Sequence, residues 1–155
     1  MTAHEQRMCE LQSEFFSTSF ALFKCSSPLF IARFMNSELA KEMDDSNNYR
    51  NYYSVPYMYH YLTDNYPSLN EKEGIKYPVP VLKWIGYIFR AYVIIKKKSS
   101  SKLYKLLKAD EMLSLYDSYH TFSVEYAVER LSEIINKSGV SLTDYQIFKQ
   151  IMTMK

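Results

Sequence analysis

The sequence predicts an all-α protein of about six to eight short helices in a single compact domain over residues 1–155. Apolar residues recur at helical spacing along most of the chain, and Ser, Thr or Ser-Pro caps precede many of these stretches. There are only 3 glycines, which disfavours turn-rich β architectures. A hydrophobic fraction of 47% and a charged fraction of 23% exclude a disordered chain.

The first half of the chain predicts three helices. Apolar residues spaced three or four apart indicate a helix over 4–24. A second is expected from 28 to about 43, with Ser27 as its N-cap and Pro28 as its first residue. A third is expected over 55–66, although the alternating tyrosines in it also fit a strand.

The central helix of the domain is expected at about 81–97. It is apolar nearly all round, so we expect the other helices to wrap it. Pro80, Lys83 and Arg90 interrupt the apolar stretch over 79–95, which is also short for a membrane span. A buried helix is therefore favoured, and no membrane partner is expected.

The second half predicts four further helices. Ser99 would cap a short one, followed by a helical stretch over 110–119. Ser123 would cap the next, which would end near Gly139. A capping box that begins at Thr143 would open the last.

Positive charge is concentrated in one segment. The formal net charge is only +2, but residues 83–108 hold eight basic residues and no acidic one. Lysines at the end of a helix also suit its dipole, so the segment has a structural explanation as well. If the segment binds nucleic acid, the expected contacts are Lys96, Lys97, Lys98, Lys102 and Lys105.

Cysteine usage favours a reducing compartment. Cys9 and Cys25 are too few for a disulfide scaffold, and neither has a metal ligand at short spacing. A Cys9–Cys25 pair is the less favoured alternative. The N-terminus is polar and lacks a secretory pattern, so a cytoplasmic protein is expected, without metal or cofactor.

No catalytic constellation is recognisable. Ser99-x-x-Lys102 matches a serine–lysine pattern but lacks its companion motifs. His4, His60 and His120 are widely separated. The sequence therefore predicts no enzyme, and His120 is expected to cap a helix end, with partner contact as the alternative.

Two residues of the central helix allow two interpretations each. Arg90 is expected to form a buried ion pair with Glu38, Asp117 or Glu129, or else to supply a pocket charge for a carboxylate or phosphate. Trp84 is expected in the core, or else as an anchor of an interface.

Four blocks together resemble a known family. They are SSPLFIARFMNSELA (26–40), LKWIGYIFRAY (82–92), SSSKLYKLLK (99–108) and LYDSYHTFSVEYAVERLSEI (115–134). The resemblance is to small all-helical bacterial proteins described as antitoxin-like and thought to be encoded beside a toxin, some with ADP-ribosyltransferase-like character. It implies a protein partner and transfers no catalytic residue.

These observations lead to a prediction of a non-enzymatic protein-binding module that neutralises a cognate toxin by covering it. The alternatives are a nucleic-acid-binding regulator that uses Lys96–Lys108, or a small enzyme or ligand pocket around Arg90 and His120. The residues expected to contact the partner are Arg33, Trp84, Arg90, Tyr116, Tyr119 and His120. The alternative role of these residues is packing inside the protein.

Overall fold

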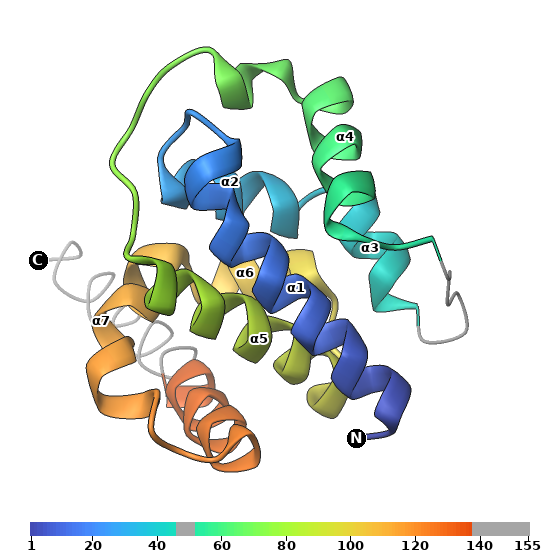
Figure 1. Cartoon of the computed structure of the whole chain (residues 1–155). Helices are drawn as coiled ribbons and strands as arrows, with labels where there is room; N and C mark the ends of the chain where they lie inside the picture. The colour runs from blue at the N-terminus through green and yellow to red at the C-terminus, as the bar shows by residue number, and fades with distance from the viewer. Residues whose placement is uncertain (46–51, 138–155) are drawn as a thin grey trace, which may run out of the picture. The chain divides into compact units, whose positions relative to one another are not determined.

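The computed structural model describes residues 1–45 and 52–137, and these contain helices and no strand (Figure 1). The all-α class with six to eight helices is confirmed. Residues 1–121 form one compact unit and a second unit begins at Phe122; one domain over 1–155 stays a prediction. The first unit contains α1 (Ala3–Leu22), α2 (Ser27–Met35), α3 (Glu38–Asp44), α4 (Val55–Asn65), the 3-10 helix η1 (Pro67–Asn70), α5 (Val79–Lys96), α6 (Ser100–Leu106) and α7 (Ala109–Tyr119).

Helices α1 and α5 form the centre of the first unit. They run side by side in opposite directions, and no other pair of helices described in residues 1–121 packs as extensively (Figure 1). The side chain of Gln12 donates to the Gly86 carbonyl at 3.0 Å, and the Ser13 hydroxyl donates to the Lys83 carbonyl at 2.8 Å. Such close approach needs a small residue on α5, and Gly86 supplies it. The expected central apolar helix is therefore confirmed.

Phenylalanines fill the space between α1 and α2. Phe15 and Phe16 of α1 meet Phe30 and Phe34 of α2 edge to face, with ring centroids 5.3–5.7 Å apart. All four are at most 1% exposed. Edge-to-face packing is favoured for aromatic rings, so this cluster fixes how the two helices cross.

The expectation of one helix from 28 to about 43 is wrong. The helix ends at Met35, and Ser37 adopts an extended backbone and caps α3 by accepting from the Ala40 N–H at 3.1 Å. The Ser37 hydroxyl also donates to the Phe34 carbonyl at 2.6 Å. Serine competes with helical hydrogen bonding in this way, so it terminates one helix and starts the next.

A strap over 73–78, without helix or strand, leads into α5 and contacts the start of α2. Its Ile75 carbonyl accepts from the Ser27 N–H, and its Tyr77 N–H donates to the Ser27 hydroxyl at 2.8 Å. The N-cap of α2 is therefore Ser26, not Ser27 as expected. The Ser27 hydroxyl accepts the Tyr77 N–H of the strap, whereas the Ser26 side chain accepts the Leu29 N–H and caps the helix.

The remaining helices follow the caps that the sequence contains. Ser54 caps α4, which is a helix and not a strand, and Ser99 caps α6. In the second unit, Ser123 accepts from the Tyr126 N–H at 3.2 Å and starts a helix over 124–137. The helix end expected at Gly139 and the helix expected after Thr143 lie outside the described residues.

Candidate functional site

An aromatic cluster joins α5 to α7. The ring of Trp84 meets Tyr116 edge-on at 5.8 Å, and Tyr116 stacks on His120 with centroids 4.3 Å apart and planes 13° apart. The His120 Nδ1 lies 2.7 Å from the Tyr116 backbone oxygen, which is the expected capping position for a donor N–H. Trp84 and Tyr116 are half-buried and His120 is exposed. The structure therefore brings three of the six expected partner contacts together.

Two further expected contacts lie on neighbouring helices. Arg33 is exposed in the last turn of α2, and α2 packs against α7. Tyr119, the last residue of α7, is half-buried.

Arg90 has a different environment. Only 1% exposed, it donates to Asp44 from Nη1 at 2.7 Å and to Gln12 from Nε at 2.8 Å. Ser100 completes this network, because its N–H and hydroxyl both donate to the Asp44 carboxylate, at 2.8 and 2.6 Å. The expected buried ion pair is confirmed, but none of its three expected partners is correct. Asp44 was missed because it lies 46 positions from Arg90, beyond any local pattern.

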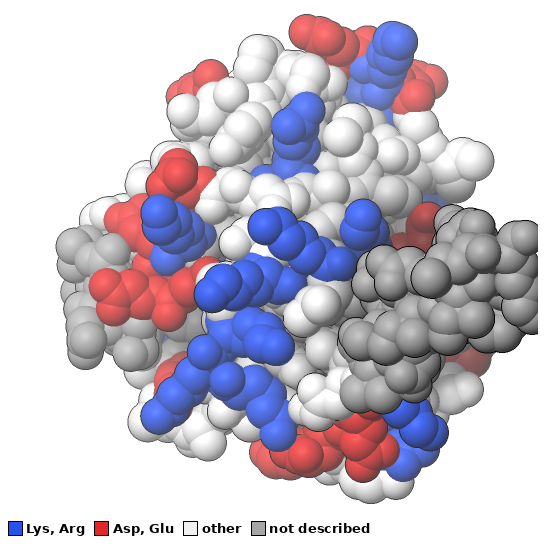
Figure 2. All heavy atoms as spheres, turned by 180° about the vertical axis from the view of Figure 1, so that it is seen from behind, with Lys and Arg blue, Asp and Glu red and all other residues white. Residues whose placement is uncertain are grey.

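The basic segment forms a surface at the end of α5 and along α6. Lys97, Lys102 and Lys105 are exposed, and Lys96 and Lys98 are half-buried. Figure 2, seen from behind the view of Figure 1, shows blue side chains gathered near the middle of this face, with acidic side chains toward its sides. We call these five lysines the basic surface.

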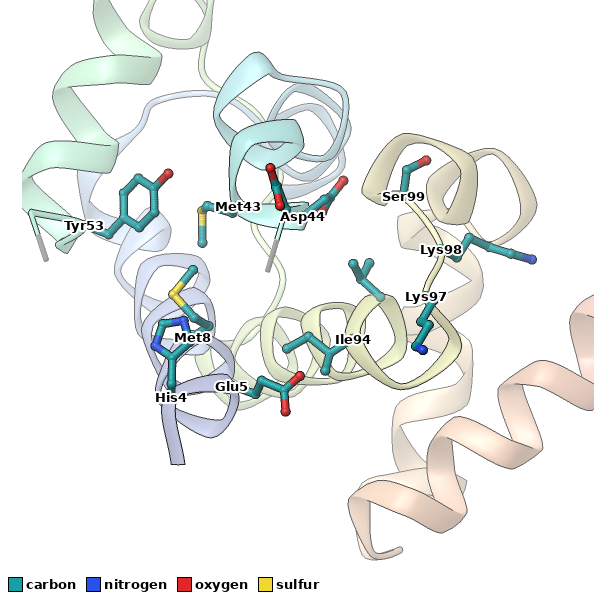
Figure 3. A pocket seen from close by; sticks show the side chains of 12 residues that line it. His4, Glu5, Met8, Met43, Asp44, Tyr53, Ile94, Lys97, Lys98 and Ser99 are labelled. Carbon is teal, nitrogen blue, oxygen red and sulfur yellow. The ribbon is translucent and has the colours of Figure 1, made fainter. Parts of the chain in front are cut away.

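The first unit contains a cavity of about 540 Å³ that no local sequence pattern indicates. Figure 3 shows Met8, Met43 and Ile94 around it, whereas the Lys98 side chain extends away. Its apolar walls carry both acidic and basic groups at the rim, so no one class of charged ligand is favoured. Arg90 and His120 are not among its lining residues, which are His4, Glu5, Met8, Met43, Asp44, Asp45, Tyr53, Val93, Ile94, Lys97, Lys98 and Ser99.

Both cysteines are free and buried, so the Cys9–Cys25 disulfide considered from the sequence does not form. Burial raises the pKa of the Cys9 thiol to about 12 and also raises the pKa of Cys25. Thiols of this kind are protonated at neutral pH and are poor nucleophiles. In the described ranges, no three His, Cys, Asp or Glu side chains are grouped as metal ligands would be.

None of the helices in residues 1–45 and 52–137 combines the length and the apolar character needed to cross a membrane.

Comparisons with protein-family models, with curated proteins and with solved structures found no match.

Proposed function

We propose that this chain is a non-enzymatic, antitoxin-like protein that binds a partner toxin and neutralises it by covering its active cleft. The aromatic cluster of Trp84, Tyr116 and His120 carries this proposal. Tryptophan, tyrosine and arginine are the residues that most often dominate binding energy at protein interfaces. The four sequence blocks that resemble antitoxin-like proteins point to the same function.

The cluster is suited to binding because it is already ordered. The stacking of His120 on Tyr116, together with the contact of the His120 Nδ1 with the Tyr116 backbone oxygen, holds both rings in place. Rings held in one conformation lose little entropy when a partner covers them, so more of the contact energy remains as affinity. Arg33, exposed on the adjacent helix α2, would add a charged contact.

The test is co-expression with the protein encoded by the adjacent gene. We expect growth to be restored and the two proteins to elute together in size-exclusion chromatography. Tyr116→Ala should raise the dissociation constant by about thirtyfold or more, as truncation of a hot spot does. Phe20→Ala, which removes an aromatic ring 45% exposed on α1, is the control and should leave binding unchanged. Unrelieved toxicity with no shared elution peak would refute the proposal.

A second candidate function is nucleic-acid binding by the basic surface. It is favoured by the exposure of Lys97, Lys102 and Lys105, and basic side chains gather on one face of the molecule (Figure 2). Binding of this kind depends on counterion release and weakens steeply with salt. Fluorescence anisotropy with a labelled duplex DNA and a single-stranded RNA should show that salt dependence. A flat titration at low salt would exclude this candidate.

A further inference from the structure

The cavity of about 540 Å³ in the first unit has no part in the proposed function (Figure 3). It is partly enclosed by residues of α1, α3 and α5, by Tyr53 just before α4, and by the turn that leads into α6. Protein interiors seldom contain voids much larger than a water molecule. Sites for small molecules measure about 300–1,000 Å³. The cavity therefore has the size of a ligand site and is far larger than a packing defect.

The walls of the cavity are apolar side chains from separate helices. Met8 of α1 is 7% exposed, Met43 of α3 is 6% exposed and Val93 of α5 is 4% exposed. Figure 3 shows the two methionine side chains extending toward each other, and Ile94 extending from α5. Methionine is flexible and its sulfur is polarisable, so walls of this kind adapt to the shape of an apolar ligand.

The acidic groups beside these walls already have partners. The Asp44 carboxylate accepts from the Arg90 Nη1 at 2.7 Å, from the Ser100 hydroxyl at 2.6 Å and from the Ser100 N–H at 2.8 Å. The Glu5 carboxylate accepts from the Thr2 N–H at 2.8 Å. A cation on a ligand would therefore have to compete with Arg90 for Asp44, at a site where the charge is already compensated.

The other charged groups are of both signs and lie at the rim. Asp45 and Lys97 both line the cavity and are exposed, and Figure 3 shows the Lys98 side chain extending away from it. A charged ligand would be attracted by one of Asp45 and Lys97 and repelled by the other. It would also lose water as it entered between apolar walls. The distribution of charge therefore favours a ligand without net charge.

We propose that this cavity binds a neutral small molecule with an apolar body, of the class of fatty alcohols and aromatic hydrocarbons. Removal of the ligand's apolar surface from water supplies the driving force. The flexible side chains of Met8 and Met43 allow the cavity to accept members of this class that differ in shape.

This inference goes beyond the proposed function. Trp84, Tyr116 and His120, which carry the proposed binding of a toxin, are not among the residues that line the cavity. Binding of a small molecule and binding of a partner protein are therefore separate properties. A ligand titration can fail while co-expression with the toxin succeeds, and the reverse also holds.

The first test is a titration of the whole chain with Nile red, a neutral dye whose fluorescence rises in apolar surroundings. We expect saturable binding of one dye molecule per chain. Decanol, decanoate and decylammonium, which share a chain and differ in charge, then compete with the dye. Decanol should displace it at a concentration about fivefold lower than either ion needs, or lower still, because the ions lose water on entering. The absence of saturable binding, or better displacement by one of the ions, would overturn the proposal.

The second test locates the bound molecule by NMR of isotopically labelled methionine methyl groups. Decanol should shift the methyl resonances of Met8 and Met43, which line the cavity. Met35 and Met112 are at most 1% exposed and lie elsewhere in the first unit, so their resonances should stay unchanged. Equal shifts of all four methyl groups, or shifts confined to Met35 and Met112, would contradict binding in the cavity.

A variant that fills the cavity provides the third test. Ile94→Trp places a large ring at a half-buried lining position and should weaken the binding of Nile red about tenfold or more. Leu106→Trp adds the same ring at a position of α6 that is 43% exposed and does not line the cavity, so binding should stay within about twofold of the parent. Circular dichroism confirms that both variants are folded. Equal affinities of the two folded variants would refute the proposal, and if Ile94→Trp does not fold, the methyl shifts decide.

Discussion

The Arg90 Nη1 donates to the Asp44 Oδ1 over 2.7 Å and so joins the middle of α5 to the last residue of α3. The arginine side chain is 1% exposed and the aspartate side chain 13%. An ion pair this deeply buried stabilises the fold only while both partners are present, because either charge alone would be buried without compensation. The Arg90 charge therefore stabilises the fold and is not available to bind a ligand.

The first prediction concerns this ion pair. Asp44→Ala should lower the free energy of unfolding by about 3 kcal/mol, because it leaves the Arg90 guanidinium buried without its carboxylate. Urea denaturation monitored by circular dichroism measures the change. Asp64→Ala, at an exposed position of α4, should change stability by less than about 0.5 kcal/mol. Equal losses in the two variants would contradict a structural role for the pair.

The second prediction concerns the contact of α1 with α5. In an isolated helix Gly86→Ala would stabilise by about 1 kcal/mol. Here a Cβ would lie 2.7 Å from the Gln12 carbonyl oxygen and 2.9 Å from Phe16, so the helices must move apart. We expect a net loss of about 1–3 kcal/mol in thermal or urea unfolding. Ser118→Ala, at an exposed position of α7, is the control; a stabilised Gly86→Ala protein would show that the helices are not this close.

The third prediction concerns the end of α5. Lys97 has φ 53° and ψ 48°, a left-handed conformation that favours glycine. Lys97→Gly should therefore raise the free energy of unfolding by about 0.5–1 kcal/mol. Lys102→Gly removes the same charge inside α6 and should destabilise by about 1 kcal/mol. If the free energy of unfolding rises in Lys97→Gly and falls in Lys102→Gly, the effect at Lys97 comes from relief of backbone strain and not from loss of the charge.

The fourth prediction concerns the thiols. At pH 8 the native protein should react slowly with a disulfide reagent, because burial holds the pKa of Cys9 near 12 and raises that of Cys25. Two thiols should react at once in urea. The raised folded pKa of Cys9 also means that its stabilising effect is complete below pH 9, the ordinary value, and is lost as pH rises toward 12. Rapid modification of the folded protein would contradict the burial of both thiols.

The sequence by itself determined the helices. Ser54, Ser99 and Ser123 each cap a helix by accepting from a backbone N–H three residues on, so the signal and its effect lie in the same short segment. The apolar stretch near 81–97 likewise indicated a buried helix without reference to any other part of the chain. Such local rules also identified His120 as a helix cap.

The tertiary structure decided which residues meet. The ion pair of Arg90 with Asp44 and the contact of Trp84 with Tyr116 each join two separate helices. The break of the expected helix at Ser37 is a local exception, because serine is compatible with both a helix and a cap. Caps and periodicity act over a few residues, whereas a contact between helices depends on how the whole apolar surface is buried, and one sequence does not specify that arrangement through any local pattern.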